Sequence, residues 1–595
     1  MLRIARHSLL LFIAGCAPAV NTAGDAPADL PARVPPVFPT GWRYPAGRSI
    51  TFAEHAMVAS NNRLASEAGA EILRAGGNAV DAAVAVGFAL AVSLPEAGNI
   101  GGGGYMLIRL ADGRRAALDY REVAPGAATA DMYLDSSGAL TKAGVIGRAA
   151  SGVPGAVAGL TAALARYGTM PLEKVMAPAI RMAAEGIVVD SAFAASVAGK
   201  DTTIRRFAGA EIFLPGGRPI TQGTRLVQQD LAETLLTIAR EGAPGFYRGR
   251  VAQQIVAEMQ RDCPATVAVR ERASHGCGII TARDLEQYRP VWREPLRTTY
   301  RGYTLLSMPP SSSGGITVGE SLNILEPFSS LPSFGTPQYF HLLASAFQRA
   351  FVDRNAKLAD PAFATVPIAE LTSKEYALRL QKTIEPDHHT PTAALETLAS
   401  EGTETTHYSV VDSQGNAVAT TTTINGLYGS GVLISGAGFF MNNEMDDFTS
   451  QAGKANQFGL VQGQSNAIAP GKRMLSAMAP TIVLDQRGKL LLVLGGRGGP
   501  RIITSTAQVI LNVIDNRMTL ADAMSAPRIH HQAIPDSLRY ERGGLEPATL
   551  AKLTEIGHAI YPREKIDAVM TAIMRVRGSY VGMDDPRSGG AAVGY

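Results

Sequence analysis

The sequence predicts an α+β fold in which two layers of antiparallel sheet are covered by helices on both sides. The part before residue 405 alternates helix and strand, and its clearest helical patterns cover residues 64–73, 78–92, 171–185, 229–240 and 251–261. The part after residue 405 is rich in strands, with hairpins predicted over residues 408–424 and 478–494. A composition of 46% hydrophobic and 18% charged residues is ordinary for a soluble globular protein.

The N-terminal residues predict export. Arg3 and Arg6 precede an apolar run over residues 9–15 that is too short for a permanent membrane span. The sequence Ile-Ala-Gly-Cys ending at Cys16 resembles a bacterial lipobox, so Cys16 is a candidate lipidation site; ordinary signal cleavage near Ala23 is the alternative. We expect a signal peptide over residues 1–15, a Pro/Ala-rich tether over 16–49 and a periplasmic or membrane-anchored bacterial protein.

Cys263 and Cys277 flank a polar insertion in the predicted globular part. In an oxidising compartment they could form a disulfide, and a pair of free thiols is the alternative.

Several classes of partner are excluded by composition and pattern. The net charge of +3 comes without a basic run, which argues against nucleic acid. Adjacent histidines, at 388–389 and 530–531, point to opposite faces of a strand, and no cysteine or carboxylate pattern completes a metal site around them. We therefore expect no metal and no cofactor.

The hairpin over residues 408–424 carries a candidate nucleophile. Its loop, Ser-Gln-Gly at 413–415, places Gly415 at the left-handed position, and pairing about Gln414 sets Thr405 opposite Thr423 with Asn425 just beyond. A threonine at a chain terminus carries its own base, because its α-amine has a pKa near 7.7–8.0. For Thr405 this requires cleavage of the peptide bond after Glu404. Taken alone, the pattern favours an ordinary strand, because threonine has a high β-propensity.

The surrounding motifs resemble those of the γ-glutamyltranspeptidase family of N-terminal-nucleophile hydrolases. The matching blocks occur in order from about residue 56 to the C-terminus, at residues 76–83, 98–104, 118–122, 309–315, 405–412, 442–448 and 495–503. The resemblance implies a four-layer αββα sandwich that cleaves itself into a large subunit, residues 50–404, and a small subunit, residues 405–595. The two would stay intertwined as a heterodimer in one domain.

The resemblance also implies roles in substrate binding. Arg121 would hold the α-carboxylate of the glutamyl group, and Asn425, Glu444 and Asp447 would hold its α-ammonium, with Asp446 structural. From the residues alone, Arg121 reads as a surface arginine paired with a neighbouring carboxylate, and the acidic run reads as a helix cap or a Ca²⁺ site.

Catalytic assistance would come from Thr423 and from the backbone amides of Gly498 and Gly499, which could stabilise an oxyanion. A phosphate-binding loop is the rival interpretation of these glycines, but the Lys-Ser/Thr ending is missing. His407 could be read as a triad base; since an N-terminal threonine supplies its own base, we expect His407 to be structural.

The chain departs from the family pattern at one contact. Where the family has two serines this chain has Ser476 and Ala477. The Ser476 hydroxyl and the Ala477 backbone amide can still donate to the α-carboxylate, but one hydroxyl contact is missing, so weaker substrate binding is expected. The loop over residues 450–464 is expected to form a lid over the glutamyl pocket.

The first functional hypothesis is a γ-glutamyltransferase and glutathione hydrolase, with glutathione or other γ-glutamyl donors and with water, amino acids or dipeptides as acceptors. The alternative is a β-lactam side-chain acylase of the same fold, which needs only the carboxylate clamp. A third, an inactive lipid-anchored binding protein, is disfavoured by the intact Thr405, Thr423, Gly498 and Gly499.

Overall fold

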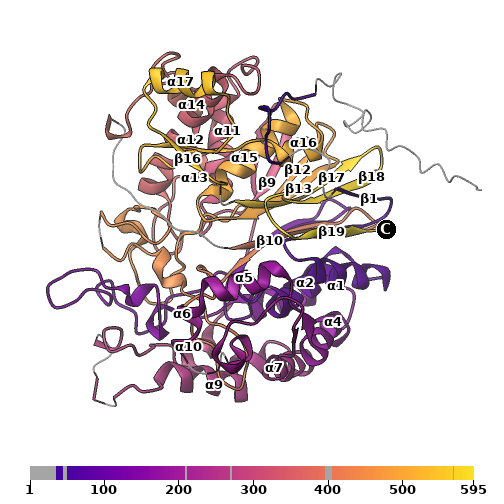
Figure 1. Ribbon diagram of the computed structural model, residues 1–595, viewed down its shortest axis with the longest axis vertical. Helices are drawn as coiled ribbons and strands as arrows, with labels where there is room; N and C mark the ends of the chain where they lie inside the picture. Colours follow the sequence, from indigo (N-terminus) through magenta and orange to yellow (C-terminus); the bar gives the residue numbers. More distant parts are fainter. Residues whose placement is uncertain are drawn as a thin grey trace, which may run out of the picture.

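Two seven-stranded sheets lie face to face at the centre of the protein, and helices cover the outer face of each (Figure 1). The computed structural model describes residues 35–44 and 50–595, apart from residues 208, 210, 265, 268–270, 395–404, 452 and 567. The predicted αββα sandwich is confirmed. Cys16 and Glu404 lie outside the described residues.

Neighbouring strands are antiparallel throughout both large sheets. The first sheet has the order β1 (Ile50–Ala53), β18 (Ser579–Asp584), β17 (Val569–Val576), β13 (Leu490–Arg497), β12 (Thr481–Leu484), β9 (Tyr303–Ser307) and β8 (Leu296–Tyr300). The second has the order β19 (Ala591–Gly594), β2 (Met57–Ser60), β10 (Thr406–Val411), β11 (Ala417–Thr423), β3 (Gly103–Arg109), β4 (Arg115–Asp119) and β7 (Val291–Arg293).

Side chains of the second sheet alternate between two hydrophobic cores. Val410 and Val418 belong to the core shared with the helices beside this sheet. Val411 and Ala419 belong to the core shared with Leu492 of β13 in the facing sheet. This two-residue period fills both faces, so strands buried on both sides read as nearly continuous apolar runs.

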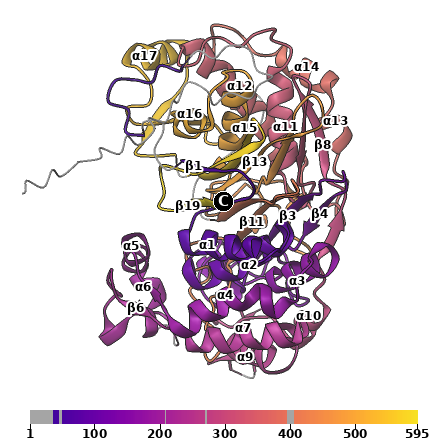
Figure 2. The same cartoon turned by 90° about the vertical axis from the view of Figure 1, so that its right-hand side faces the viewer.

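The helices form two groups, one on each side of the stacked sheets (Figure 2). Beside the second sheet lie α1 (Arg63–Arg74), α2 (Ala79–Ser93), α3 (Ala156–Tyr167), α4 (Leu172–Glu185), α7 (Gln229–Glu241) and α9 (Gly249–Gln260). Beside the first lie α11 (Gly314–Leu325), α12 (Pro337–Lys357), α14 (Lys374–Gln381), α15 (Arg501–Ile514), α16 (Leu520–Ser525) and α17 (Pro547–Ile556). None of the helices in the described part of the chain has both the length and the apolar character needed to cross a membrane.

The α1–α2 corner follows from the sequence. Residues 76–77 are both glycine, and Gly76 has φ +90°, which breaks the helical course. Asn78 then caps α2: its side chain accepts from the backbone of Asp81, while the Asp81 carboxylate accepts from the backbone N–H of Asn78. This capping box starts α2 one residue after the predicted start.

The hairpin of β10 and β11 has the predicted register. Thr406 pairs with Thr422 and Val411 with Ala417, which is symmetric about Gln414. Gly415 has φ +84°, the left-handed conformation expected of the loop glycine. Thr405 and Thr423 therefore lie at the same end of the hairpin, which is central in its sheet because β10 pairs with β2 and β11 pairs with β3.

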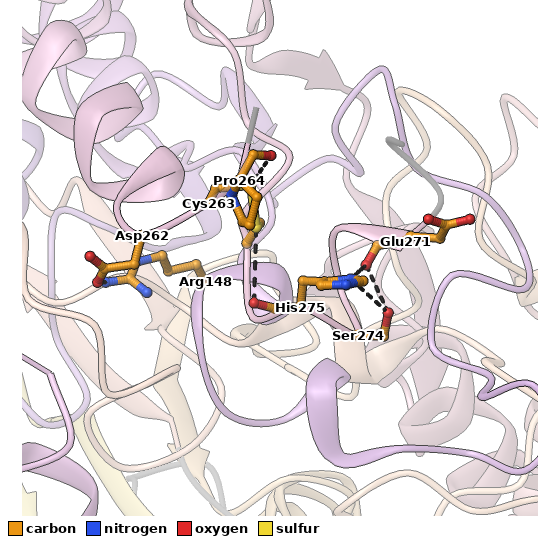
Figure 3. The surroundings of a disulfide bond; sticks show 8 residues. Arg148, Asp262, Cys263, Pro264, Glu271, Ser274 and His275 are labelled. Atoms are coloured by element: carbon orange, nitrogen blue, oxygen red, sulfur yellow. Dashed lines mark hydrogen bonds and ion pairs between the residues drawn. A yellow bond between two sulfur atoms is a disulfide. The ribbon is translucent and has the colours of Figure 1, made fainter. Parts of the chain in front are cut away.

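A disulfide joins Cys263 to Cys277, with a Cα–Cα distance of 5.4 Å (Figure 3). Ala273, inside the closed loop, packs in a small core with Met445 and Phe448. Met445 follows Glu444 in the chain and Phe448 follows Asp447, so the loop closed by the disulfide packs against the segment that carries these two carboxylates.

Candidate active site

One small cavity is lined by most of the residues predicted for the site. They come from strands, loops and a helix start that are distant in sequence: Arg121, Thr405, Thr423, Asn425, Glu444, Asp447, Ser476, Ala477 and Gly499. Gly498 precedes Gly499 in the chain but is not part of the wall. The cavity has a volume of about 20 Å³, room for about one water molecule. A larger ligand therefore requires movement of the surrounding side chains.

The two threonines end neighbouring strands. Thr405 immediately precedes β10, and Thr423 is the last residue of β11; both are buried. The Thr423 hydroxyl oxygen accepts a hydrogen bond of 2.7 Å from the backbone N–H of Asn425. A hydroxyl that accepts in this way keeps its own proton to donate. Asn425 has φ +72°, uncommon for a residue other than glycine, and its side chain donates to the Asn443 carbonyl.

Arg121 is fully buried at the end of β4, so its interpretation as a surface arginine is wrong. Its guanidinium bonds the Glu444 carboxylate and, at 2.5 Å, Asp447 Oδ2. Glu122 lies 3.6 Å away. The residues predicted to bind opposite charges of one substrate thus contact one another.

Three carboxylates surround this one guanidinium. Burial raises the pKa of Glu122 to about 7 and the pKa values of Glu444 and Asp447 above their ordinary range, although Arg121 opposes the shift. In the described part of the chain, Glu444 Oε2 has no hydrogen-bond partner. The buried Arg354 guanidinium also lowers the pKa of Asp447, yet the three carboxylates still outnumber the two guanidiniums, which suits a ligand that brings a cation with it.

The loop over residues 450–464 closes one side of the cavity. Asn456 Nδ2 donates to Asp447 Oδ1 at 2.9 Å, and the Gln457 N–H donates to Asp446 Oδ2 at 3.0 Å. Asp446 therefore faces the loop and not the cavity, and burial raises its pKa to about 8. Phe458 of this loop lines the cavity.

Phe458 also packs against the glycine turn after β13. A Cβ atom at Gly499 would lie 2.6 Å from the Phe458 ring, and Gly499 has φ +55°, so glycine is required twice over. The predicted strand end at Leu494 is too early: β13 continues to Arg497, and α15 begins at Arg501.

His407 lies between the sheets. Its Nδ1 is 2.8 Å from Thr421 Oγ1, and a Cβ at Gly495 would meet its ring at 2.4 Å. Burial lowers its pKa to about 3, so the ring is neutral and packed away from the cavity. This agrees with a structural role.

Ser476 and Ala477 form a wall that is held by the loop before α11. The Ser476 N–H donates to the Ser311 carbonyl at 3.1 Å, and the Ser476 carbonyl accepts from the Ser313 N–H at 2.8 Å. Ala477 lines the cavity without a hydroxyl, as the sequence predicts.

Sequence reasoning missed one convergence of histidines with a carboxylate. The Nε2 atoms of His389 and His531 lie 2.9 and 3.2 Å from Asp536 Oδ1, so the expectation that no carboxylate joins these histidines is wrong. His531 Nδ1 accepts from the Ala533 N–H, which places the proton on Nε2 and directs it at Asp536. A metal would need the lone pair of that same Nε2. The group is therefore better suited to hydrogen bonding than to metal ligation.

The apolar wall of the cavity was also missed: Phe458, Leu460, Leu475, Met478, Pro500 and Ile502. These residues lie within or beside the recognised motifs, but apolar side chains carry no pattern that separates a pocket wall from ordinary core.

Comparison with known proteins gives concordant results. The family model described as Gamma-glutamyltranspeptidase matches residues 65–595. The chain is 43% identical to a glutathione hydrolase proenzyme of Escherichia coli K12, covering 90% of this chain and 91% of the relative. It is 41% identical to the Acylase ACY 1 proenzyme of Pseudomonas sp. SE83, covering 87% and 89%.

Solved structures with the same fold include a cephalosporin acylase from Bacillus halodurans. It has a TM-score of 0.79 and 29% identity, and the match covers 94% of this chain and 99% of that one. A γ-glutamyltranspeptidase from Helicobacter pylori gives a TM-score of 0.52 and 40% identity over 56% of this chain and 92% of that one.

Proposed function

This chain belongs to the gamma-glutamyltranspeptidase family, and on that premise we propose that it is a γ-glutamyltransferase and glutathione hydrolase with Thr405 as its nucleophile. The observation that carries the assignment of roles is the single cavity that joins Thr405 and Thr423 to Arg121, Glu444 and Asp447. A nucleophile beside a pocket that holds one guanidinium and two carboxylates suits a donor whose end carries both an ammonium and a carboxylate.

The reaction uses Thr405 and Gly499 of the cavity wall together with the preceding Gly498. The Thr405 hydroxyl oxygen adds to the γ-carbonyl carbon of the donor, and its proton passes to the Thr405 α-amine. The C–N bond of the amide then breaks, and that proton leaves with the departing amine. Water resolves the glutamyl ester to glutamate, or an amine acceptor forms a new amide. Backbone N–H groups at Gly498 and Gly499 stabilise the oxyanion, a contribution of roughly 2.7–4 kcal/mol per donor.

Self-cleavage before Thr405 creates the α-amine. It requires attack by the Thr405 hydroxyl on the Glu404 carbonyl, followed by hydrolysis of the resulting ester. The products, residues 50–404 and 405–595, stay together because β2 of the large piece pairs with β10 and β19 of the small one. The pairs β1–β18, β11–β3 and β12–β9 also join the two pieces, so separating them would break strand ladders in both sheets.

Substrate binding rearranges the ion pairs of the cavity. Arg121 turns from Glu444 and Asp447 toward the α-carboxylate, assisted by Ser476, and the α-ammonium takes its place between the two carboxylates and Asn425. The exchange keeps every buried charge paired, because the substrate brings one charge of each sign. The loop over residues 450–464 acts as a lid, since it bonds Asp447 directly.

A β-lactam side-chain acylase is the second candidate. Two observations favour it: Ala477 removes one contact to the α-carboxylate, and acylases stand among the relatives. The retained Glu444 and Asp447 favour the γ-glutamyl donor, because a glutaryl side chain has no ammonium. Turnover of a glutaryl β-lactam faster than of a γ-glutamyl anilide would reverse this ranking.

We place the protein outside the cytoplasm as an exported bacterial enzyme, with Cys16 as its lipid anchor. The support is the N-terminal sequence alone. Cys16-dependent incorporation of a palmitate analogue tests this, and its absence would exclude the anchor while leaving the enzyme assignment intact.

The decisive experiment compares wild type with Thr405→Ala by gel electrophoresis and by hydrolysis of a γ-glutamyl anilide. The wild type should appear as two fragments with activity, and the variant as one inactive chain. An intact and inactive wild-type chain would contradict the proposed function. Two active fragments formed by Thr405→Ala would contradict the choice of nucleophile.

A further inference from the structure

Two residues outside the substrate cavity hold the start of strand β10. Asn61 Oδ1 accepts from Thr406 Oγ1 at 3.1 Å and from the His407 N–H at 3.2 Å. Asn61 Nδ2 donates to Asp584 Oδ1 at 2.9 Å. All four side chains are buried.

The orientation of the Asn61 amide is determined by its neighbours. The His407 backbone N–H can only donate, so the atom facing it must be the amide oxygen. The NH₂ group then faces Asp584, whose second oxygen accepts from Ser588 Oγ and from the Gly590 N–H. These two hydrogen bonds hold the Asp584 carboxylate in place, and the carboxylate in turn holds the Asn61 amide.

The contact extends a strand ladder by one position. Strand β2 ends at Ser60, which pairs with Tyr408, so the next backbone pair would be residue 61 with His407. The Asn61 side chain supplies the acceptor there instead of the backbone. Asp584 ends β18 in the facing sheet, so the Asn61–Asp584 bond also joins the two sheets at the end where Thr405 lies.

Resting on the role proposed for Thr405, we propose that Asn61 and Asp584 are positioning residues for the nucleophile. After cleavage Thr405 is covalently held only through Thr406. The direction of its hydroxyl and amine then depends on how firmly residues 406 and 407 are held, and a displacement of about 1 Å in a reacting group can cost 100-fold in rate. Neither Asn61 nor Asp584 lines the substrate cavity, so both should affect kcat rather than KM.

The hydrogen bond between Asn61 and Asp584 depends on the charge of the Asp584 carboxyl. Burial raises the pKa of Asp584 to about 7, with Asp585 raising it further and with Ser588, Asn61 and Arg497 lowering it. In Asn61→Asp two carboxylates face each other and must share a proton, so activity should fall as rising pH removes that proton. In Asp584→Asn the single amide oxygen can accept either from Asn61 Nδ2 or from the Gly590 N–H, so the new NH₂ group faces an N–H donor at the other position and the contact is strained.

Exchange of the two side chains is the sharpest test. In the double variant Asn61→Asp with Asp584→Asn, the amide introduced at position 584 still donates to position 61. The carboxylate introduced at position 61 still accepts from Thr406 and His407. We expect each single variant to lose at least tenfold in kcat on a γ-glutamyl anilide with KM within twofold, and the double variant to recover most of that loss. Asn62→Ala is the matched control: Asn62 caps α1, and its loss should lower the melting temperature without lowering kcat.

The outcomes separate three cases. An inactive wild type would overturn the proposed function itself. An active wild type with single variants within twofold in kcat, or with a double variant no better than the Asn61→Asp single, would overturn the positioning role. If the single variants do not cleave themselves, the extent of self-cleavage of the full chain is compared instead: recovery of cleavage in the double variant supports the positioning role, and no recovery overturns it.

Discussion

Two buried clusters of ionisable side chains in this protein differ in the ratio of guanidiniums to carboxylates. Around Arg121 one guanidinium faces three carboxylates: Glu122, Glu444 and Asp447. In the C-terminal cluster two guanidiniums, of Arg528 and Arg587, face two carboxylates, of Glu541 and Asp585. Arg121, Glu444 and Asp447 of the first cluster line the cavity beside Thr405, whereas no member of the second cluster lines that cavity.

The pKa shifts follow this balance. Burial raises the pKa values of all three carboxyls around Arg121, whereas Arg528 and Arg587 hold the pKa of Asp585 below its ordinary range despite its burial. A balanced buried cluster stabilises the fold once formed, and removal of one partner is costly. An unbalanced cluster is ready to take a charged ligand. The comparison therefore separates a structural ion network from a binding site.

The largest effect is expected from Arg587→Met, which leaves Glu541 and Asp585 buried with one guanidinium fewer. The free energy of unfolding should fall by about 3–5 kcal/mol, measured by urea unfolding or as a drop in melting temperature. Arg542→Met, which removes an exposed pair with Glu564, is the control and should change little. Equal losses in the free energy of unfolding for the two variants would show that burial of the ion pairs does not determine their contribution to stability.

Asp447→Asn should lower activity and leave stability unchanged, the opposite of the result expected for Arg587→Met. Loss of one charge from the carboxylate-rich cluster should reduce kcat/KM for a γ-glutamyl anilide by about 100-fold, or about 2.7 kcal/mol, without lowering the melting temperature. Self-cleavage should continue, since it involves no glutamyl ammonium. Asp446→Asn, at a position that faces the loop over residues 450–464, should lose less activity; an equal loss of cleavage and turnover in Asp447→Asn would contradict the binding role.

The clusters should also respond to different pH ranges. Glu122, with its pKa raised to about 7, gains a proton as pH falls through 7, so the cavity loses attraction for an ammonium and kcat/KM should decline. Asp585 has a depressed pKa, so its contribution to stability is present above about pH 4 and is lost only below it. Activity should therefore fall between about pH 7 and 5, a range in which Asp585 stays ionised, and Glu122→Gln should flatten that activity profile.

The smallest effect is expected from Ala477→Ser, which supplies the hydroxyl missing from the cavity wall. KM for a γ-glutamyl anilide should fall about threefold to tenfold with kcat unchanged, because the new hydrogen bond reaches a charged group but costs some side-chain freedom. Steady-state kinetics of both proteins measure it. An unchanged KM would show that position 477 does not contact the α-carboxylate.

Much of the fold could be predicted because its signals are local. Helix α1 follows from its 3.6-residue period, the corner before α2 from Gly76 and the capping box at Asn78, and the β10–β11 register from Gly415. The predicted strand end at 494 is too early because Gly495 and Gly496 read as a break, while in the structure they stay in β13 where His407 and Met570 pack over them.

The candidate site is predicted by a different route, the ordered motifs that resemble one family. Those motifs name Arg121, Glu444 and Asp447 but not their contacts with one another. Nor do they name Asn61 and Asp584, which are separated by 523 residues. No local pattern links positions so far apart in the chain.

By itself the sequence determined the αββα fold class, the hairpin that presents Thr405, and the family to which the chemistry belongs, because periodicity, turn glycines and motifs are written along the chain. Tertiary structure alone decided which buried groups meet: three carboxylates around the Arg121 guanidinium, two carboxylates with Arg528 and Arg587, and the Asn61 amide between Thr406 and Asp584. Charge balance depends on burial and distance, and both arise only when the two sheets stack.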